Sequence, residues 1–480
     1  MSLNSRWQEN ADLRRLVLAA GAMLVWNIIS WRFPFFWDSV LHSKTATWYL
    51  NTGFSSITVP ERLDAGHPPG FNLYLALVWK VFGRSLWVAH AAMLPFLGLL
   101  LVQFNALLRT FVNERGRGWA MLLLFCEPTF LTQAGMVSAD IALLAGSLLA
   151  LNAVVKRKGI LLGLGMLLMA AVSFRGILMV GLIAAIDVVW AWLDGSRRLN
   201  WRAVVPYAVV GFVVLLWLWV HWLAVGWVMS PPAETYGGQR QVLGLAGMAR
   251  NVALMGWRVM DFGRVALWLL AAVALVWRIK CSSWRSLLTD RMLWAVLVVF
   301  GGLGLLFMPI SNPPGHRYFL LGYSLLVILA VGGLSPVGAE RWWMWLGKLV
   351  AGAAMVTGHL WIYPRGVAQG WDASLAHLPG FELQDQVDAY LTSKGVAPSE
   401  VCADFPWLHA PEDTHLAPAR AGGWWRNYLE EKDCRWVVAS NLNNGFTDED
   451  WAAFDAGKDW KLDQEFHSGR IWMRVYQRSQ

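Results

Sequence analysis

The sequence has little charge, few cysteines and none of the common soluble-enzyme motifs. Only 15% of its 480 residues are Asp, Glu, Lys or Arg, while 56% are hydrophobic and the mean hydropathy is +0.42. It has no P-loop, no GxSxG motif and no CxxC pair, so ATP hydrolysis, α/β-hydrolase catalysis and thioredoxin-like redox chemistry have no support. Soluble domains rarely have this composition, and the sequence therefore predicts a polytopic α-helical membrane protein.

Long apolar stretches dominate the sequence instead. A helix needs about 20 consecutive apolar residues to cross the hydrocarbon core of a bilayer. The first stretch is too long for a cleavable signal peptide and lacks its small-residue cleavage site, so we expect it to remain as a span. The 32 tryptophans suit two interfacial belts, although packing bulk alone would account for some of them. The eleven predicted spans are 13–31, 86–108, 118–134, 138–155, 160–174, 176–193, 203–228, 264–280, 292–309, 317–334 and 342–362.

Lysine and arginine predict the orientation, because short cytoplasmic loops are enriched in both. The basic group Arg109–Arg117 stays on the N-terminal side only if two spans precede it. The apolar segment Phe71–Phe82 must then not cross, and its length of about a dozen residues predicts an interfacial helix over 69–82. This places the N-terminus in the cytoplasm and the loops 32–67 and 229–263 outside. The other basic groups assigned to the cytoplasm are Arg6, Arg14, Arg15, Lys156–Lys158, Arg197–Arg202 and Arg278–Arg291.

The charge divides the chain into two domains. Residues 1–364 carry a net charge of +15 and form the predicted transmembrane module, whereas residues 365–480 carry −7. The sequence pI of about 9.4 therefore reflects basic inner loops. No basic arm interleaved with aromatic residues is present, so we predict no nucleic-acid partner.

The C-terminal 116 residues predict a small α/β domain outside the membrane. Cys402 and Cys434 both lie in it and could pair in an oxidising compartment. Cys126 lies in a span and Cys281 in a cytoplasmic loop, so neither is expected to be bridged. The predicted elements are helices over Glu382–Ser393, Trp424–Glu431 and Asp448–Phe454, strands over Val401–Phe405 and Arg435–Ala439, and a hairpin of Lys461–His467 with Ile471–Gln477.

Acidic residues near the outer side are the first candidates for chemistry. Asp38 follows an aromatic stretch and precedes a helix-like segment, where it could cap that helix or act as a general base. His42 falls one turn later and could orient an acceptor. Ser138 or Asp140 could cap the helix that begins there. Glu127 lies inside a predicted span, where a carboxylate needs a partner or a wet cavity.

Basic residues on the outer side run against the positive-inside rule. Arg175 and Arg317 lie there, as do Arg258 and Arg264. An anionic lipid phosphate would stabilise them, because the arginine fork matches phosphate oxygens, whereas headgroup snorkelling is the simpler alternative.

A divalent metal is the one cofactor to consider, and no nucleotide is expected. Mg, Mn or Zn accept carboxylate and imidazole ligands, although the spacing here matches no strong signature. The candidate ligands are His42, Glu61, Asp64 and His67.

Several short motifs follow one another along the chain. They are Phe36-Trp-Asp38, His67-Pro-Pro-Gly, Glu127-Pro, Gly135-Met-Val-Ser-Ala-Asp140, Ser173-Phe-Arg175-Gly and His316-Arg-Tyr318. In this order they resemble the GT-C superfamily of polytopic glycosyltransferases. The likeness is greatest to the branch of aminoarabinose (lipid A) transferases and protein O-mannosyltransferases, and it covers roughly residues 10–335. Many members carry a second acid where this chain has Ser39, and a Lys where it has His67.

The resemblance implies inverting transfer of a sugar from a polyprenyl-phosphate donor at the outer face of the inner membrane. It implies that Asp38 is the catalytic base and that Asp140 is a second acidic residue of the catalytic site. Arg175, Arg317 and Tyr318 would contact the donor phosphate. The acceptor would be a hydroxyl of a lipid, glycan or protein. Candidates for further substrate contacts are His42, His67 and Glu127.

Two other classes remain as alternatives. A lipid or sugar flippase should show internal repeats, and the spans show no convincing period. A non-catalytic GT-C-like binding subunit would keep the fold and lose the chemistry, and Ser39 beside Asp38 keeps this alternative open.

Overall fold

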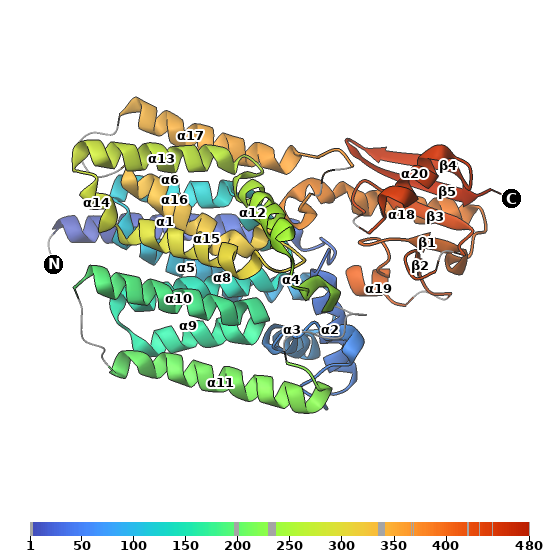
Figure 1. Ribbon diagram of the computed structural model, residues 1–480, viewed down its shortest axis with the longest axis horizontal. Coiled ribbons are helices and arrows are strands. Elements are labelled where there is room, and N and C mark those ends of the chain that lie inside the picture. Colours follow the sequence, from blue (N-terminus) through green and yellow to red (C-terminus); the bar gives the residue numbers. More distant parts are fainter. Residues whose placement is uncertain are drawn as a thin grey trace.

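A helical bundle with a small mixed domain at one end makes up the protein (Figure 1). The computed structural model describes residues 3–195, 201–228, 237–334, 341–365, 367, 369–419, 422–431, 433–443 and 445–479. The predicted basic residues Arg197 and Arg198, and residues 229–236 of the predicted outer loop, lie outside these ranges. The bundle helices are α1 (Leu3–Ser30), α4 (Leu86–Ala91), α5 (Leu94–Phe111), α6 (Glu114–Cys126), α7 (Pro128–Gly135), α8 (Ala139–Lys156), α9 (Gly159–Val172), α10 (Phe174–Leu193), α11 (Trp201–Val225), α12 (Leu245–Met260), α13 (Arg264–Cys281), α14 (Arg285–Leu288), α15 (Arg291–Phe307), α16 (Leu320–Gly333) and α17 (Trp342–Thr357).

Every predicted span coincides with helix, but the spans are less uniform than the sequence suggested. Within the described residues, six helical stretches are long and apolar enough to cross a bilayer. Helices α9 and α15 are apolar but shorter, and α6 ends before Pro128, which cannot donate the backbone hydrogen bond that would continue it. The six are Asn10–Ser30, Leu86–Phe111, Ala139–Lys156, Phe174–Leu193, Val204–Val225 and His316–Gly333.

The predicted outer loop 229–263 is partly helical, which the sequence analysis missed. Helix α12 occupies Leu245–Met260 and meets α13 at a bend of 84°. Asp261 and Gly263 lie at the bend, and Gly263 adopts φ 80°, which a glycine allows without steric cost. The bend sends α12 across the end of the bundle (Figure 1).

Helices α2 (Ser39–Asn51) and α3 (Gly70–Phe82) form the body of the first outer loop and pack against each other. Helix α3 has 13 residues, which is too short to span. Its position agrees with the non-crossing helix that the charge pattern predicted. Both helices lie at the end of the bundle that carries the C-terminal domain (Figure 1).

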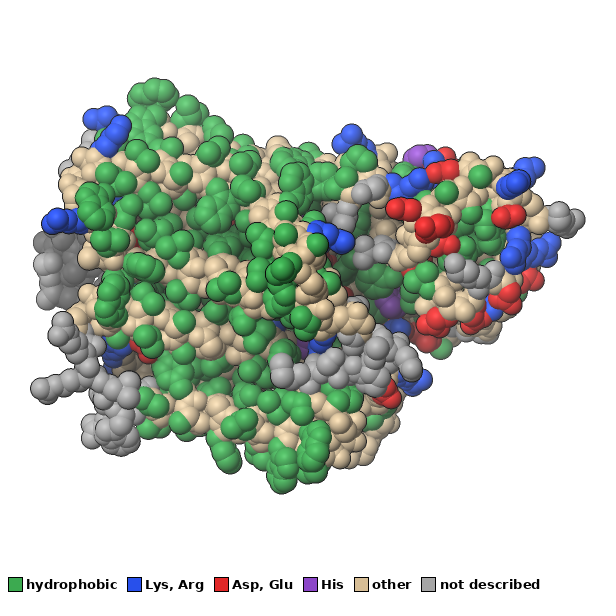
Figure 2. Space-filling view, viewed as in Figure 1, with side chains coloured by type: hydrophobic (Ala, Val, Ile, Leu, Met, Phe, Trp, Pro, Cys, Tyr) green, Lys and Arg blue, Asp and Glu red, His purple; other side chains and the backbone are tan. Residues whose placement is uncertain are grey.

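Charged side chains avoid the flank of the bundle and gather at its ends and on the C-terminal domain (Figure 2). At the N-terminal end, Asp12 accepts from Arg109 and Arg117, each at 2.9 Å. Arg157 pairs with Asp187 at 2.8 Å. Between the two ends, large apolar side chains stay exposed, as a lipid-facing surface requires. Examples are Leu18 (73%), Val188 (70%) and Leu215 (66%).

The C-terminal domain has a five-stranded sheet in the order β2-β1-β3-β5-β4. Strand β1 runs parallel to β2 and β3, while β5 runs antiparallel to β3 and β4. A disulfide joins Cys402 to Cys434, whose Cα atoms are 5.9 Å apart, so the pairing that the sequence allowed is present. The elements are α18 (Pro379–Ser393), β1 (Val401–Ala403), α19 (Pro411–Thr414), β2 (Arg426–Asn427), β3 (Trp436–Ser440), α20 (Asp448–Ala456), β4 (Trp460–Ser468) and β5 (Ile471–Arg478).

The helix predicted over Trp424–Glu431 was wrong. Residues 426–427 form β2 at the edge of the sheet, and turns follow. Gly422 and Gly423 before it both have positive φ, and Trp425 is buried with its ring stacked on that of Trp424. Tertiary packing of the tryptophans and the parallel pairing with β1 therefore decide this segment.

The short turns η5 (Trp371–Ala373) and η6 (Leu375–His377) dock the C-terminal domain on the bundle. The His377 ring stacks on Phe36 with centroids 4.1 Å apart. Gln133 of α7 donates to the backbone carbonyl of Asp372 at 2.7 Å. These contacts fix the start of the C-terminal domain beside the first outer loop.

Candidate active site

Three carboxylates and two guanidinium groups meet at the outer-loop end of the bundle. Arg317, in the turn η3 (His316–Phe319), lies at the centre and forms an ion pair with Asp38. Its Nε is 3.6 Å from Asp140 Oδ2 and 3.2 Å from Asp372 Oδ2. Arg175, at the start of α10, forms an ion pair with Asp140. The predicted residues Asp38, Asp140, Arg175 and Arg317 therefore form one cluster.

Tyr318 completes this cluster. Its ring centroid lies 3.9 Å from the Arg175 guanidinium carbon and 5.7 Å from that of Arg317. The Nε and Nη1 atoms of Arg175 are buried and have no hydrogen-bond partner in the described protein. Two donor nitrogens of a cation are thus without an acceptor.

Local backbone geometry presents Asp38 to the cluster. Trp37 adopts φ 57°, a left-handed conformation that bulky residues rarely adopt. Ser39 satisfies the local backbone by accepting from the Phe36 N–H at 2.9 Å. Asp38 stands at the N-cap position of α2 but makes no capping hydrogen bond with its side chain. The capping alternative is therefore wrong for Asp38.

Electrostatics keep Asp38 ionised. Burial among protein groups would raise the pKa of its carboxyl, but the Arg317 guanidinium outweighs that effect and the pKa lies below its ordinary value. Its side chain is 55% exposed, whereas that of Arg317 is only 13% exposed. A charged, accessible carboxylate can accept a proton from an incoming group.

Asp140 is also free of a capping role. Ser138 caps α8, because its hydroxyl accepts from the Asp140 backbone N–H at 3.2 Å. The Asp140 side chain is buried and faces the two arginines. Of the two residues considered for the cap, the serine holds it.

Asp372 is the member of the cluster that the sequence analysis missed. Burial raises the pKa of its carboxyl against the opposing effect of Arg317, and the charges of Asp38 and Asp140 raise it further. It stands in an irregular segment with no periodic pattern to place it. Its only signal in the sequence is an acid shortly after the last predicted span, on the same predicted side as Asp38.

Glu127, a predicted substrate contact, has its carboxylate paired inside the protein. It is fully buried, caps α7 by accepting from Thr129 N and Phe130 N, and accepts from Arg264 Nε at 2.6 Å. The expectation that a carboxylate at this depth needs a partner is confirmed. Arg264, equally buried, is that partner. Arg258 is likewise used internally and donates to two backbone carbonyls at 2.8 Å each.

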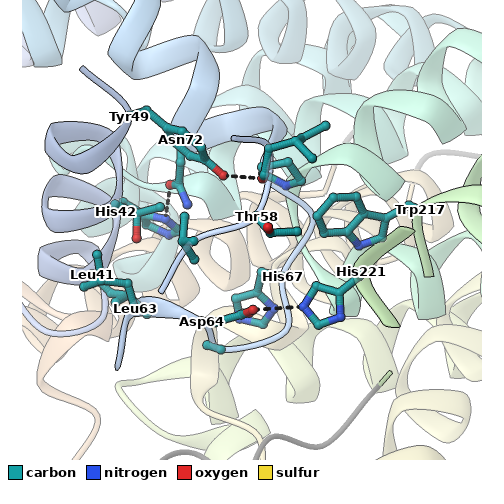
Figure 3. Close-up of a pocket in the computed structure, with 15 residues that line it drawn as sticks. Leu41, His42, Tyr49, Thr58, Leu63, Asp64, His67, Asn72, Trp217 and His221 are labelled. Atoms are coloured by element: carbon teal, nitrogen blue, oxygen red, sulfur yellow. Dashed lines mark hydrogen bonds and ion pairs between the residues drawn. The ribbon is translucent and has the colours of Figure 1, made fainter. Parts of the chain in front are cut away.

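The four candidate metal ligands do not form one ligand set. His42 Nδ1 lies 2.7 Å from Asn72 Oδ1, and Asp64 is engaged by His221 at 2.9 Å. Glu61 is exposed. Across the ranges that the structure describes, no group of three or more His, Cys, Asp or Glu side chains is arranged to hold a metal ion. His42, Asp64 and His67 instead line a small pocket (Figure 3).

The chain shares its fold with two solved proteins, in agreement with the fold class that the motifs predicted. The chain is similar to ArnT from Cupriavidus metallidurans bound to undecaprenyl phosphate, with a TM-score of 0.57 and 13% identity over 96% of this chain and 97% of that one. The apo state of the same protein gives 0.53, with 13% identity over 99% and 98% of the two chains. The arabinofuranosyltransferase AftD from mycobacteria gives 0.50 and 15% identity over 100% of this chain and 40% of its own. Both proteins are glycosyltransferases. No protein-family model and no curated protein matches the sequence.

Proposed function

We propose that this protein is an integral-membrane glycosyltransferase. It transfers a sugar from a polyprenyl-phosphate donor to an acceptor hydroxyl, with inversion at the anomeric carbon. The observation that carries the proposal is the meeting of an ionised, accessible Asp38 with the two guanidinium groups of Arg175 and Arg317. The fold neighbour solved with undecaprenyl phosphate supports the lipid-phosphate part of this proposal.

The arginines suit the leaving group. A departing phosphate is already a stable anion, so it needs electrostatic stabilisation rather than an acid catalyst. The buried, unpartnered Nε and Nη1 of Arg175 match that need, because an unsatisfied buried donor costs about 1–3 kcal/mol until an acceptor arrives. Two phosphate oxygens can fill both positions. Arg317 and Tyr318 border the same space.

Asp38 suits the proton transfer. The acceptor hydroxyl gives its proton to the Asp38 carboxylate while its oxygen bonds to the anomeric carbon. The bond from that carbon to the phosphate oxygen breaks at the same time, and the polyprenyl phosphate departs. Asp140 holds Arg175 through its ion pair and so positions the phosphate contact. Asp372 lies 3.2 Å from Arg317, and its carboxylate reduces the effect of the Arg317 charge on the pKa of Asp38.

We place this site at the outer face of the inner membrane. The N-terminus and helix α2, which follows Asp38, lie at opposite ends of the bundle (Figure 1). Basic loops gather at the N-terminal end, which the positive-inside rule assigns to the cytoplasm. The C-terminal domain then faces the periplasm, where its disulfide is stable. The acceptor would be a lipid, glycan or protein hydroxyl presented there.

Sugar transfer by purified protein in detergent or liposomes tests the proposal. Asp38→Asn should abolish turnover while leaving the melting temperature unchanged. The matched control is Glu382→Gln, which neutralises an exposed acid on α18 and should keep full activity. Donor movement across liposomes without transfer would favour a flippase. Donor binding without turnover on any donor would favour a non-catalytic subunit. Either result would overturn the enzymatic proposal.

A further inference from the structure

A buried histidine stands directly before Arg317 and packs between two distant segments of the chain. His316 is 2% exposed, and its ring lies beside that of Phe262 with centroids 4.8 Å apart. On another side the ring meets the backbone of Gly370, at the start of the C-terminal domain. The proposed reaction gives this side chain no role, so its surroundings are the next question.

One ring nitrogen is bound at the bend between α12 and α13. His316 Nε2 lies 2.9 Å from Asp261 Oδ2, and because a carboxylate oxygen accepts, this nitrogen carries the proton and donates it. The other Asp261 oxygen accepts from the Phe262 N–H at 2.7 Å and from the Tyr363 hydroxyl. Both carboxylate oxygens are occupied, so the imidazole is held firmly against the bend.

The other ring nitrogen faces Gly370 at a distance that requires glycine. A Cβ atom added to Gly370 would overlap His316 Nδ1 and stand 2.8 Å from Cε1. Nδ1 is buried and has no hydrogen-bond partner among the residues that the structure describes. Non-bonded atoms pack at about 3.5–4.0 Å, so a larger residue at 370 would force the ring or the turn to move by about 1 Å.

Gly370 begins the turn that carries Asp372. Its carbonyl accepts from the Ala373 N–H at 3.0 Å, and Asp372 lies between these two residues. Asp372 Oδ2 is 3.2 Å from Nε of Arg317, the residue that follows His316. The contact between the ring and the glycine therefore joins the two backbone segments that bring this acid to this arginine.

We propose that His316 is a positioning residue, whose ring sets the distance between Asp372 and Arg317. This inference rests on the proposed transferase function. Gln133 of α7 anchors the turn, while the ring of His316 decides how closely the turn approaches the arginine. With Asp372 in place, Arg317 divides its charge among three carboxylates. With Asp372 displaced, more of that charge acts on Asp38, which becomes a weaker base.

Gly370→Ala tests the contact without touching a charged group. The added methyl collides with the ring and moves the turn, so we expect the single-turnover rate constant at saturating donor to fall roughly tenfold or more. The donor concentration that gives half the maximal rate should change less than about twofold, because Arg175 still binds the phosphate. The matched control is Gly315→Ala on the other side of His316. Gly315 has φ −65° and nothing within 4 Å of an added Cβ, so this variant should keep the wild-type rate.

Two further variants distinguish positioning from a general loss of folding. In an Asp372→Asn background, Gly370→Ala should lower the rate constant less than about twofold further, because the displaced acid has already lost its charge. His316→Gln keeps an N–H for Asp261 but has no ring against Gly370. We expect its melting temperature to be unchanged and its rate constant to fall as in Gly370→Ala.

The possible outcomes separate this inference from the proposed function. A wild-type rate in Gly370→Ala or His316→Gln, or additive losses in the double variant, would overturn the role of His316 and leave the transferase intact. Absence of turnover by the wild-type protein on any polyprenyl-phosphate donor would instead overturn the proposed function.

Discussion

Replacing Arg175 by lysine tests the phosphate contact most directly. Lysine keeps a positive charge near Asp140 but loses the fork that carries the unpartnered Nε and Nη1. Hydrogen bonds to charged groups contribute about 1.5–3 kcal/mol each, so losing two costs about 3 kcal/mol or more. Every 1.36 kcal/mol is a factor of ten, and we expect kcat/KM to fall roughly 100-fold or more in Arg175→Lys.

The assay is single-turnover sugar transfer over a range of donor concentrations, with binding of the polyprenyl phosphate measured in parallel. Arg285→Lys is the control, because Arg285 is an exposed arginine in α14 near the N-terminal end of the bundle. Arg175→Ala should be worse than the lysine variant, since it also leaves Asp140 without its ion pair. If Arg175→Lys keeps wild-type kcat/KM and donor affinity, the two free N–H groups do not touch the phosphate.

Three further results are expected. The acid limb of the kcat/KM profile should lie at lower pH than for an ordinary aspartate, because a base must be deprotonated and Arg317 lowers the pKa of Asp38 against the effect of burial. Arg317→Gln should move that limb to higher pH, and an unmoved limb would exclude Asp38 as the titrating base. Glu127→Gln should destabilise the protein by about 3–5 kcal/mol, because the fully buried Arg264 loses its charge partner. The destabilisation would be measured as a lower denaturant midpoint, and an unchanged midpoint would contradict the structural role of Glu127. Replacing Cys402 and Cys434 by serine should lower the unfolding free energy of the C-terminal domain by about 2–4 kcal/mol. Loss of sugar transfer with an unchanged unfolding free energy would contradict a stabilising role of the disulfide.

The sequence predicted the helices well because lipid imposes a simple rule. Each apolar stretch had to become helix to satisfy its backbone, and charge counting predicted that Phe71–Phe82 is a helix that does not cross. The break at Pro128 and the bend before Arg264 were not predicted, because hydropathy measures the length of an apolar stretch and not where a helix bends. The structure of the segment Trp424–Glu431 was predicted wrongly because the packing of its tryptophans against the sheet decides its conformation.

The candidate site was predictable in part for a related reason. Asp38, Asp140, Arg175 and Arg317 stand near the ends of predicted spans, where few polar residues occur and each one is conspicuous. Glu127 was conspicuous too, but a buried ion pair and a substrate contact look the same in a sequence. Asp372 lies in an irregular segment, and only the folded chain shows which acid of that segment reaches Arg317.

The turn that carries Asp372 has a consequence for how the protein matures. The first outer loop emerges early in synthesis, yet the acid that borders Arg317 arrives only after the last bundle helix has been inserted. A ribosome-bound or truncated chain ending near residue 364 would leave Arg317 with Asp38 and Asp140 as its only acidic neighbours in the cluster. Grafting a different outer domain onto this bundle would therefore have to retain residues 371–377, which dock on Phe36 and bring Asp372 to Arg317.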